Sequence, residues 1–234
     1  ATLLVEHGDR IVSMGKAPGI ADGVRRIMEN YEPDRAMAGR FHKAVGDVFE
    51  QAGEWDDAAK AYRRASEEKG GSSTEVASAL MRLGELYLKK GALAKSEKVL
   101  RRAHGIAESI DAPGLLAETK YLLGSLFIMK NKKEEARKAF EDGLRLSRGL
   151  NSKTEGRCLY GLGRVYQEDG NLDLAIRTKK KAAAILEEAG ERIELAKVLA
   201  ALPGRRRAPL RPRLEAAHLL FGAVSGVSSV RAAL

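Results

Sequence analysis

The feature that most constrains this 234-residue chain is a motif that occurs four times at nearly constant spacing. Each copy has a glycine directly after an apolar residue and an aromatic residue three positions later. The glycines are Gly46, Gly84, Gly124 and Gly163, and the aromatic residues are Phe49, Tyr87, Phe127 and Tyr166. Successive glycines are 38, 40 and 39 residues apart. A period of this size indicates repeated supersecondary units that stack on one another to bury a common core.

Further residues follow each glycine at fixed distances. A turn residue comes first, and a small residue lies twelve positions after the glycine. A residue with a large side chain lies four positions beyond the small residue. In chain order these sets are Gly53, Gly91, Asn131 and Gly170; Ala58, Ser96, Ala136 and Ala175; and Tyr62, Leu100, Phe140 and Lys179. Glycine and asparagine tolerate the left-handed backbone that ends many helices, and small residues allow two helices to approach closely. The pattern therefore predicts two antiparallel helices per repeat, here named A and B.

This pattern resembles the tetratricopeptide repeat over residues 39–189. The resemblance implies an all-α fold, a right-handed α-solenoid of antiparallel helix hairpins. The repeats are about five residues longer than the 34-residue form, and they lack the proline that normally closes helix B. In this they are similar to the repeats of kinesin light chains and of bacterial signalling ATPases, kinases and transcriptional regulators. Lys179 stands where a bulky apolar residue is expected. We expect it to extend towards solvent or to shift helix B locally.

Composition divides the chain into three parts. Residues 1–38 lack a clean repeat and contain two helical pieces separated by Ala17-Pro18-Gly19, so we expect a degenerate repeat or a cap. Residues 39–202 form the repeat array, with four full repeats and the helix A of a fifth. That last helix should end before Pro203-Gly204. The chain starts without methionine, which fits either a fragment of a longer protein or ordinary methionine removal.

Residues 203–234 form a basic tail with six arginines, one glutamate, three of the six prolines and no lysine. One interpretation is a disordered extension, and another is a repeat array interrupted by a reading-frame change. A third is contact of the arginines with nucleic acid or an acidic membrane. The apolar stretch 219–230 is too short to span a bilayer, but it could cover the open last repeat.

Charge and composition narrow the classes of function. The net charge of +9 comes from 41 basic and 32 acidic residues. Outside the tail the two signs are nearly balanced and interleaved, as on a solvated helix face, which argues against nucleic-acid binding. The single cysteine, Cys158, excludes an internal disulfide framework and fits a reducing cytoplasm. No cluster of cysteine and histidine has zinc-site spacing, and no apolar run is long enough to span a membrane.

Motifs for catalysis are missing or incomplete. Gly15-Lys16 lacks the rest of a phosphate-binding loop, and the serine in residues 222–226 is one position late for a nucleophile elbow. We expect His42 to be a half-buried packing residue and Cys158 a small packing residue rather than catalytic groups. The sequence therefore predicts no enzymatic activity, cofactor or metal.

The resemblance also indicates where a partner would bind. In the tetratricopeptide family, helix A residues line a concave groove that recognises extended peptides or helices. The candidates by repeat position are Arg40, Lys43, Asp47, Met81, Arg82, Glu85, Tyr121, Ser125, Ile128, Met129, Tyr160, Arg164 and Gln167. The apolar members could instead pack between repeats. The chaperone-binding branch uses lysines and asparagines as a carboxylate clamp. This chain has Lys43, but Ala44 and Asp47 replace the asparagines, which argues against chaperone tails.

We therefore expect a noncatalytic, cytoplasmic interaction scaffold that binds a peptide or helix of another protein in bacterial signalling or regulation. The alternative is a sensor or regulatory fragment of a larger kinase, signalling ATPase or transcriptional regulator whose catalytic domain lies outside this chain. An open last repeat exposes apolar surface, so self-association is a secondary expectation.

Overall fold

The computed structural model describes residues 17–30, 33–34, 37–68 and 70–202, and every regular element within them is an α-helix. Helix α2 (Ala17–Asn30) precedes four hairpins, and α11 (Arg192–Ala200) follows them. The hairpins are α3 (Ala38–Gln51) with α4 (Trp55–Glu67), α5 (Ser73–Lys89) with α6 (Leu93–Ser109), α7 (Pro113–Met129) with α8 (Lys133–Ser147), and α9 (Ser152–Glu168) with α10 (Leu172–Glu188). The predicted all-α solenoid is confirmed. The expectations for the first helical piece and for the tail lie outside the described residues.

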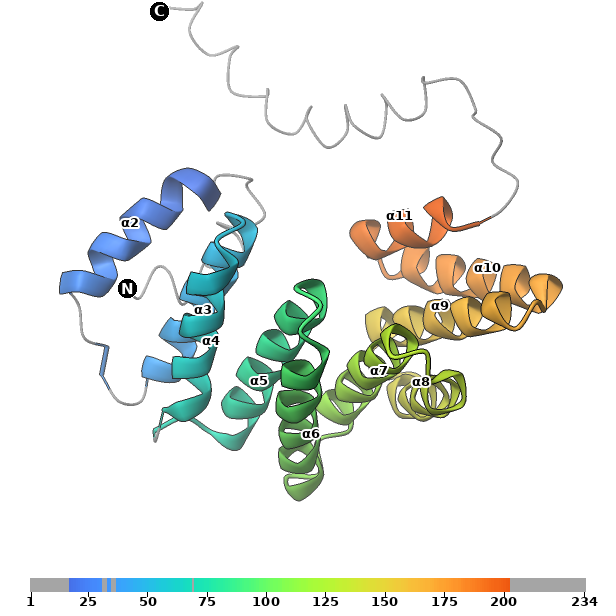
Figure 1. The fold of residues 1–234 in the computed structure, drawn as a ribbon, viewed down its shortest axis with the longest axis horizontal. Coiled ribbons are helices and arrows are strands. Elements are labelled where there is room, and N and C mark those ends of the chain that lie inside the picture. The colour runs from blue at the N-terminus through green and yellow to red at the C-terminus, as the bar shows by residue number, and fades with distance from the viewer. Residues whose placement is uncertain (1–16, 31–32, 35–36, 69, 203–234) are drawn as a thin grey trace, which may run out of the picture.

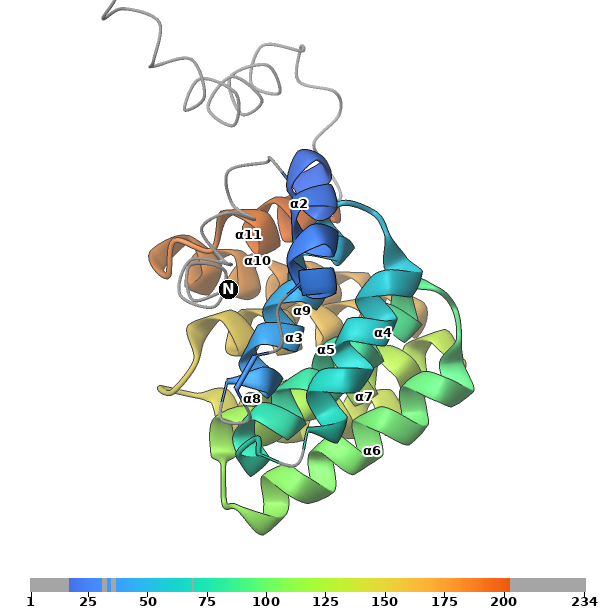
Figure 2. The ribbon, with the colours of Figure 1, turned by 90° about the vertical axis from the view of Figure 1, so that its left-hand side faces the viewer.

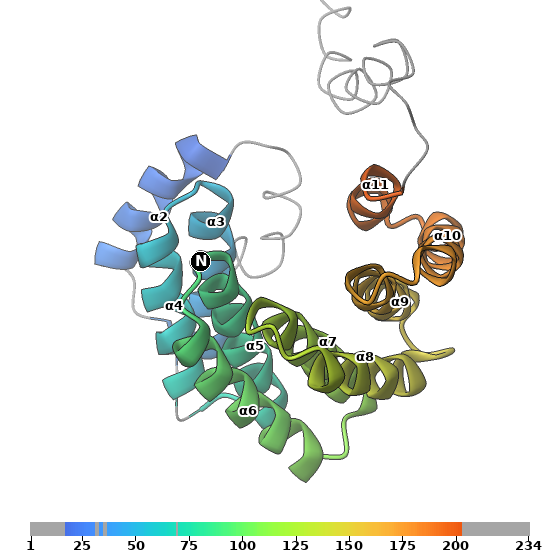
Figure 3. The ribbon, with the colours of Figure 1, turned by 45° about the vertical axis from the view of Figure 1, so that its right-hand side comes forward.

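The helices form two layers that curve into an arc, with α2 and α11 at its two ends (Figure 1). Each A helix packs against the next, from α3 through α5, α7 and α9 to α11, whereas each B helix packs mainly against the A helices beside it. Figure 2 views the arc from the α2 end, and Figure 3 shows α7 and α8 between the first hairpins and the α9–α11 group. We call the surface formed by α3, α5, α7, α9 and α11 the concave face.

The four turns between helices A and B have the same geometry. The predicted turn residues Gly53, Gly91, Asn131 and Gly170 have φ values of 80°, 70°, 56° and 76°. The next residue then donates its backbone N–H to the carbonyl of the motif aromatic residue, as in Glu54 to Phe49 at 2.8 Å and Ala92 to Tyr87 at 2.9 Å. This bond satisfies a carbonyl that the end of the helix would otherwise leave unpaired. The repeat therefore closes each helix A at an equivalent point.

The motif glycines are needed because a large side chain of helix B lies directly over each of them. A Cβ atom at Gly46, Gly84, Gly124 or Gly163 would lie 2.5–2.6 Å from Tyr62, Leu100, Phe140 or Lys179, respectively. The small residues of helix B are buried beside this contact, with Ala58, Ser96 and Ala136 at 0% exposure and Ala175 at 2%. Close approach of the two helices thus requires a bare backbone on one helix and a long side chain on the other.

Phe140 also joins neighbouring repeats. Its ring lies against Gly124 of α7 in its own hairpin and against Gly161 of α9 in the next, where added Cβ atoms would lie 2.6 and 2.5 Å from ring carbons. Leu186 of α10 packs in a similar way against Gly156 of α9. The ring of Phe140 is therefore held between the A helices of two successive hairpins.

The two ends of the array differ from the repeats. Residues 17–19 belong to the first turn of α2, so the second helical piece includes these residues instead of following them; proline is tolerated in a first helical turn because no hydrogen bond is lost. Ala21 and Val24 of α2 are buried against the first hairpin. At the other end, α11 has 9 residues whereas α5, α7 and α9 have 17. The described part of the fifth helix A is therefore about half as long as the A helices of the second, third and fourth repeats.

Substitution of Gly124 by alanine tests the packing of glycine against Phe140. Alanine favours a helix by about 1 kcal/mol over glycine, but overpacking costs about 1–3 kcal/mol, and Gly161 stops the ring from moving away. We expect Gly124→Ala to lower the free energy of unfolding by about 1–2 kcal/mol in urea denaturation. Gly105→Ala is the matched control, since no atom lies within 4 Å of its new Cβ. It should raise that free energy by about 0.5–1 kcal/mol. Equal effects at both positions would contradict the packing argument.

Candidate interaction surface on the concave face

The thirteen predicted groove residues divide by burial. Met81 and Ile128 are 5% and 9% exposed and belong to apolar clusters between repeats, so they pack in the core instead of lining an open surface. Asp47 is also buried, at 7% exposure. Arg40, Met129 and Gln167 are exposed. The remaining side chains are half-buried: Lys43, Arg82, Glu85, Tyr121, Ser125, Tyr160 and Arg164.

Asp47 is held at the base of the concave face near its N-terminal end. Its carboxylate accepts a hydrogen bond from the Tyr62 hydroxyl at 2.7 Å and from Lys43 Nζ at 3.0 Å, and Arg82 Nε lies 3.4 Å away. Burial and the carboxylates of Asp47 and Glu50 raise the pKa of Tyr62 well above its usual value. The hydroxyl therefore stays protonated and donates to Asp47. Asp47 joins helix B of the first hairpin to α5, and its role is to hold the lining together.

Arg157 of α9 spans three successive A helices. Its guanidinium nitrogens lie 3.6 Å from Glu85 of α5 and 3.7 Å from Glu118 of α7, and the guanidinium carbon is 4.0 Å from the centre of the Tyr121 ring. Burial acts to lower the pKa of Arg157, but the charges of Tyr121, Glu85 and Glu194 raise it above its usual value. A side chain of α9 can reach α5 only because the array is strongly curved.

Reasoning from the sequence missed Arg157 and Glu118, although a signal for them exists. Both lie six residues before their motif glycine, the position that Arg40 occupies in the first repeat. Applying the assignment of Arg40 to every repeat would have found them. In the structure Arg40 also pairs with the next A helix, since its Nε lies 3.0 Å from Glu75. In three of the four repeats, the residue six positions before the glycine therefore takes part in an ion pair that joins A helices, and Ser78 occupies this position in the second repeat.

Glu85 is the acidic centre of this surface. Burial acts to raise its pKa, but the nearby Arg157, Lys89, Arg82 and Lys197 together lower the pKa below its usual value. Lys197 belongs to α11, so residues of α5, α9 and α11 all contribute to the electrostatic environment of this one carboxylate. In the first three repeats the concave face is thus built from paired charges.

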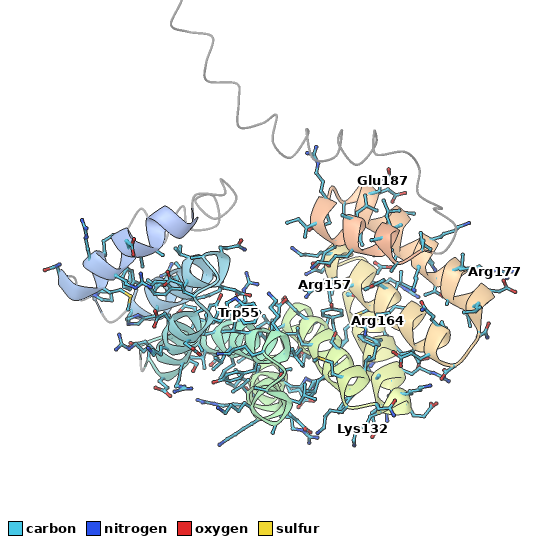
Figure 4. All side chains as sticks on the ribbon, turned by 45° about the horizontal axis from the view of Figure 1, so that its top comes forward. Trp55, Lys132, Arg157, Arg164, Arg177 and Glu187 are labelled. Atoms are coloured by element: carbon cyan, nitrogen blue, oxygen red, sulfur yellow. The ribbon has the colours of Figure 1, made fainter. Side chains whose placement is uncertain are left out.

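Arginines occur on both layers of the array. Figure 4 shows Arg157 and Arg164 on the inner side of the arc and Arg177 at its outer edge on α10. Arg102 and Arg177, both on B helices, are exposed, and neither forms an ion pair within the described residues. These outer arginines offer a comparison set for the concave ones.

The described residues contain one arrangement that resembles a catalytic triad, and its geometry excludes that role. His104 Nδ1 lies 3.4 Å from the Thr119 hydroxyl, and His104 Nε2 lies 3.3 Å from Glu108. Thr119 is completely buried, and its hydroxyl donates to the carbonyl of Leu115 at 2.9 Å in its own helix. A substrate therefore cannot reach this oxygen, and the hydroxyl satisfies its own backbone.

The other candidate reactive groups are packing residues. Cys158 is 0% exposed, and burial raises its pKa to about 12, so the thiol is protonated and unreactive at neutral pH. The His42 side chain is 13% exposed and packs edge-on against Phe41, and burial lowers its pKa. Both predictions, of a small packing cysteine and a half-buried packing histidine, are confirmed. Among the described helices, none is both long and apolar enough to cross a membrane.

Comparison with known families gives the same assignment as the geometry. Two tetratricopeptide repeat models match the chain, one over residues 42–72 and one over residues 75–149. The chain is a tetratricopeptide-repeat protein. The matched segments cover all of its first three hairpins except the first residues of α3 and α5, and the fourth hairpin has the same turn, glycine and small-residue geometry. A search of curated protein sequences finds no match to the chain.

Solved structures contain similar tetratricopeptide arrays. The apo form of RapI is 12% identical, with a TM-score of 0.71 over 95% of this chain and 85% of that protein. A Rap protein complexed with competence and sporulation factor is 17% identical, with a TM-score of 0.64 over 86% of this chain and 56% of that protein. A putative kinesin light chain from Podospora anserina is 13% identical, with a TM-score of 0.62 over 80% of this chain and 95% of that protein. At these identities the likeness shows the fold alone.

The ion pairs of Arg157 give a testable effect on stability. Removal of one partner of a buried pair costs roughly 3 kcal/mol, so we expect Arg157→Gln to lower the free energy of unfolding at pH 7 by about that amount. Arg145→Gln is the control, because Arg145 is 74% exposed and pairs with Asp142 only at 3.6 Å. Its cost should be about 0.5 kcal/mol or less. Similar losses from both substitutions would contradict a central role for Arg157.

The loss of unfolding free energy in Arg157→Gln should depend on pH. The folded-state pKa of Glu85 lies below its ordinary value of 4.5, so its stabilising effect is complete above that pH. The effect is lost as the pH falls through the lower folded-state pKa. The difference in unfolding free energy between the original chain and Arg157→Gln should therefore be largest near neutral pH and decrease below pH 4.5. A difference that stays constant down to pH 3 would contradict this origin of the stability.

Proposed function

We propose that this chain is a noncatalytic scaffold that binds an extended peptide or a helix of a partner protein on its concave face. The observation that supports this proposal is the set of side chains that the A helices leave open there. Arg40, Arg82, Tyr160, Arg164 and Gln167 all lie on A helices and are at least partly exposed. Arginine and tyrosine are the side chains that most often anchor protein interfaces.

The construction of the concave face also suits a binding surface. Ion pairs such as Arg40–Glu75 and Arg157–Glu85 hold successive A helices in register, so the lining is ordered before a partner arrives. A preorganised surface loses less conformational entropy on binding. The face has both charged groups and a half-buried aromatic ring at Tyr160, which fits a peptide with mixed polar and apolar side chains better than a purely apolar helix.

We place this scaffold in the cytoplasm of a bacterium, in signalling or regulation. Two observations support that setting. The lone cysteine is buried and unpaired, as expected in a reducing compartment. One structurally similar protein was solved as a Rap protein complexed with competence and sporulation factor. By analogy, the partner of this chain is a regulatory peptide or a segment of a regulatory protein.

The proposal is tested by affinity capture from a lysate of the source organism with the full-length chain as bait. The concave variant carries Arg40→Ser and Arg164→Ser, and the control variant carries Arg102→Ser and Arg177→Ser. Both variants lose two arginine charges, from A helices in one case and from B helices in the other. We expect one protein to bind the original chain and the control but to bind the concave variant at least tenfold more weakly when retested in purified form.

Circular dichroism and the Tm of both variants should match those of the original chain, because all four arginines are at least partly exposed. This check separates a loss of binding from a loss of fold. Equal binding by the concave variant and the original chain would contradict a concave site. Loss of binding in the B-helix variant alone would move the interface to the outer layer of the array.

A further inference from the structure

The fourth repeat differs from the others at the residue that covers the motif glycine. Tyr62, Leu100 and Phe140 occupy this position in the first three repeats, and Lys179 occupies it in the fourth. The Lys179 side chain runs along Gly163, where an added Cβ would lie 2.6 Å from Lys179 Cγ, and the residue is only 2% exposed. It therefore neither extends into solvent nor leaves the helix packing. The predicted extension towards solvent is wrong, because the bare glycine provides room inside the hairpin.

The charge of Lys179 has no acidic partner within the described residues. Its ammonium donates to the Gln167 side-chain oxygen and to the Ala201 carbonyl at 3.3 Å, and it lies 6.0 Å from the centre of the Tyr160 ring. These neighbours are neutral dipoles, which compensate a buried charge only in part. Burial, and secondarily the charge of Arg164, lower the pKa of Lys179 below its usual value.

Arg164 adds a second uncompensated cation to the same place. It is half-buried, and among the described residues it makes no ion pair or side-chain hydrogen bond. The cations that line the concave face in the earlier repeats differ, because each has a carboxylate within 4.0 Å. These pairs include Arg40–Glu75, Lys43–Asp47, Arg82–Asp47 and Lys89–Glu50. Positive charge is thus left over at the α9–α10 end of the face.

These groups surround a hollow on the surface. Its lining consists of Tyr160, Arg164, Gln167, Glu168, Lys179 and Ala201. Glu168 contributes the one carboxylate of the lining and is exposed, so the two cations still leave a net positive charge. A second hollow shares Gln167, Lys179 and Ala201 with the first and is otherwise lined mainly by apolar side chains, including Leu172 and Ile176.

We propose that the first hollow, named here the Arg164–Lys179 pocket, binds a carboxylate of the peptide that occupies the concave face. This inference rests on the proposed function. The carboxylate is either an acidic side chain or the C-terminus of the peptide, and an apolar residue next to it enters the adjoining hollow. A carboxylate can accept two parallel hydrogen bonds from a guanidinium and one from an ammonium, and it compensates both charges.

The energy of burying a charge favours a binding role for this lysine over a packing role. An apolar side chain at position 179 would fill the space over Gly163 without burying a charge, as Leu100 does over Gly84. Replacement of buried charges by apolar residues is often stabilising. Lys179 therefore makes the free chain less stable than it could be, and a bound carboxylate removes that penalty only in the complex. Functional groups commonly lower stability in this way.

The pocket is tested with a phage-displayed library of random octapeptides, selected on the full-length chain. The most enriched peptide is then synthesised in three forms: unchanged, with each acidic side chain replaced by its amide, and with an amidated C-terminus. Fluorescence polarisation measures the Kd of each. We expect one of the two neutral forms to bind about tenfold or more weakly, as for loss of one charge-assisted hydrogen bond, and the form that loses affinity identifies the source of the carboxylate.

Variants of the chain then locate the effect. Lys179→Met should raise the Tm and yet reduce the preference for the acidic over the neutral peptide, a combination that a purely structural lysine would not produce. Arg164→Gln, at a half-buried position, should weaken the same preference and gives a second test that does not disturb the packing over Gly163. Lys181→Met, at an exposed position on α10, is the control and should leave the preference unchanged.

The possible failures are distinguishable. One possible result is that the selected peptides bind the Arg40→Ser, Arg164→Ser variant more weakly but bind the original chain equally well in their acidic and neutral forms. That result would overturn the pocket and leave the proposed function in place. An acid preference that is undiminished in Lys179→Met would also overturn it. Failure to select any peptide that depends on the concave face would contradict both the pocket and the proposed function.

Discussion

The fold depends on one contact that recurs in every repeat, a long side chain of helix B lying on the bare backbone of a glycine in helix A. The glycine brings the two helix axes close together, and the long side chain fills the space that this approach leaves. Phe140 shows how the contact extends beyond one hairpin, because its ring lies between Gly124 and Gly161 of successive A helices. At this junction the spacing within one hairpin and the spacing to the next hairpin are therefore set by the same side chain.

The curvature in turn determines the concave face. Successive A helices lie close enough for ion pairs to connect them, and Arg157 reaches past α7 to Glu85 of α5. Such pairs place most of the concave charges in fixed partnerships, so they order the surface and add little net charge. The exception lies at the end of the face, where Arg164 and Lys179 have no carboxylate partner among the described residues. A surface with paired charges along its length and a positive charge at one end is suited to bind a peptide in one orientation.

Much of this could be predicted from the sequence, because the relevant signals are local. The glycine, the small residue and the turn residue recur at fixed distances, and each acts within one hairpin, so Gly53, Gly91, Asn131 and Gly170 have the predicted left-handed backbone. The lining of the concave face was harder to predict. Whether a side chain faces an open surface or the next repeat depends on how tightly the array curves, and this is why Met81 and Ile128 are buried. The reach of Arg157 across two repeats likewise depends on the curvature and not on its own helix. The buried position of Lys179 required knowledge of the space over Gly163.

The central claim is that a partner binds the concave face formed by the A helices. The most direct measurement is photo-crosslinking of a bound peptide to the full-length chain, with the crosslinked residues mapped by mass spectrometry. The account predicts crosslinks on α5, α7, α9 and α11, concentrated around Tyr160, Arg164 and Gln167 for a photoreactive group placed beside the carboxylate of the peptide. Crosslinks confined to the B helices α4, α6, α8 and α10 would contradict it.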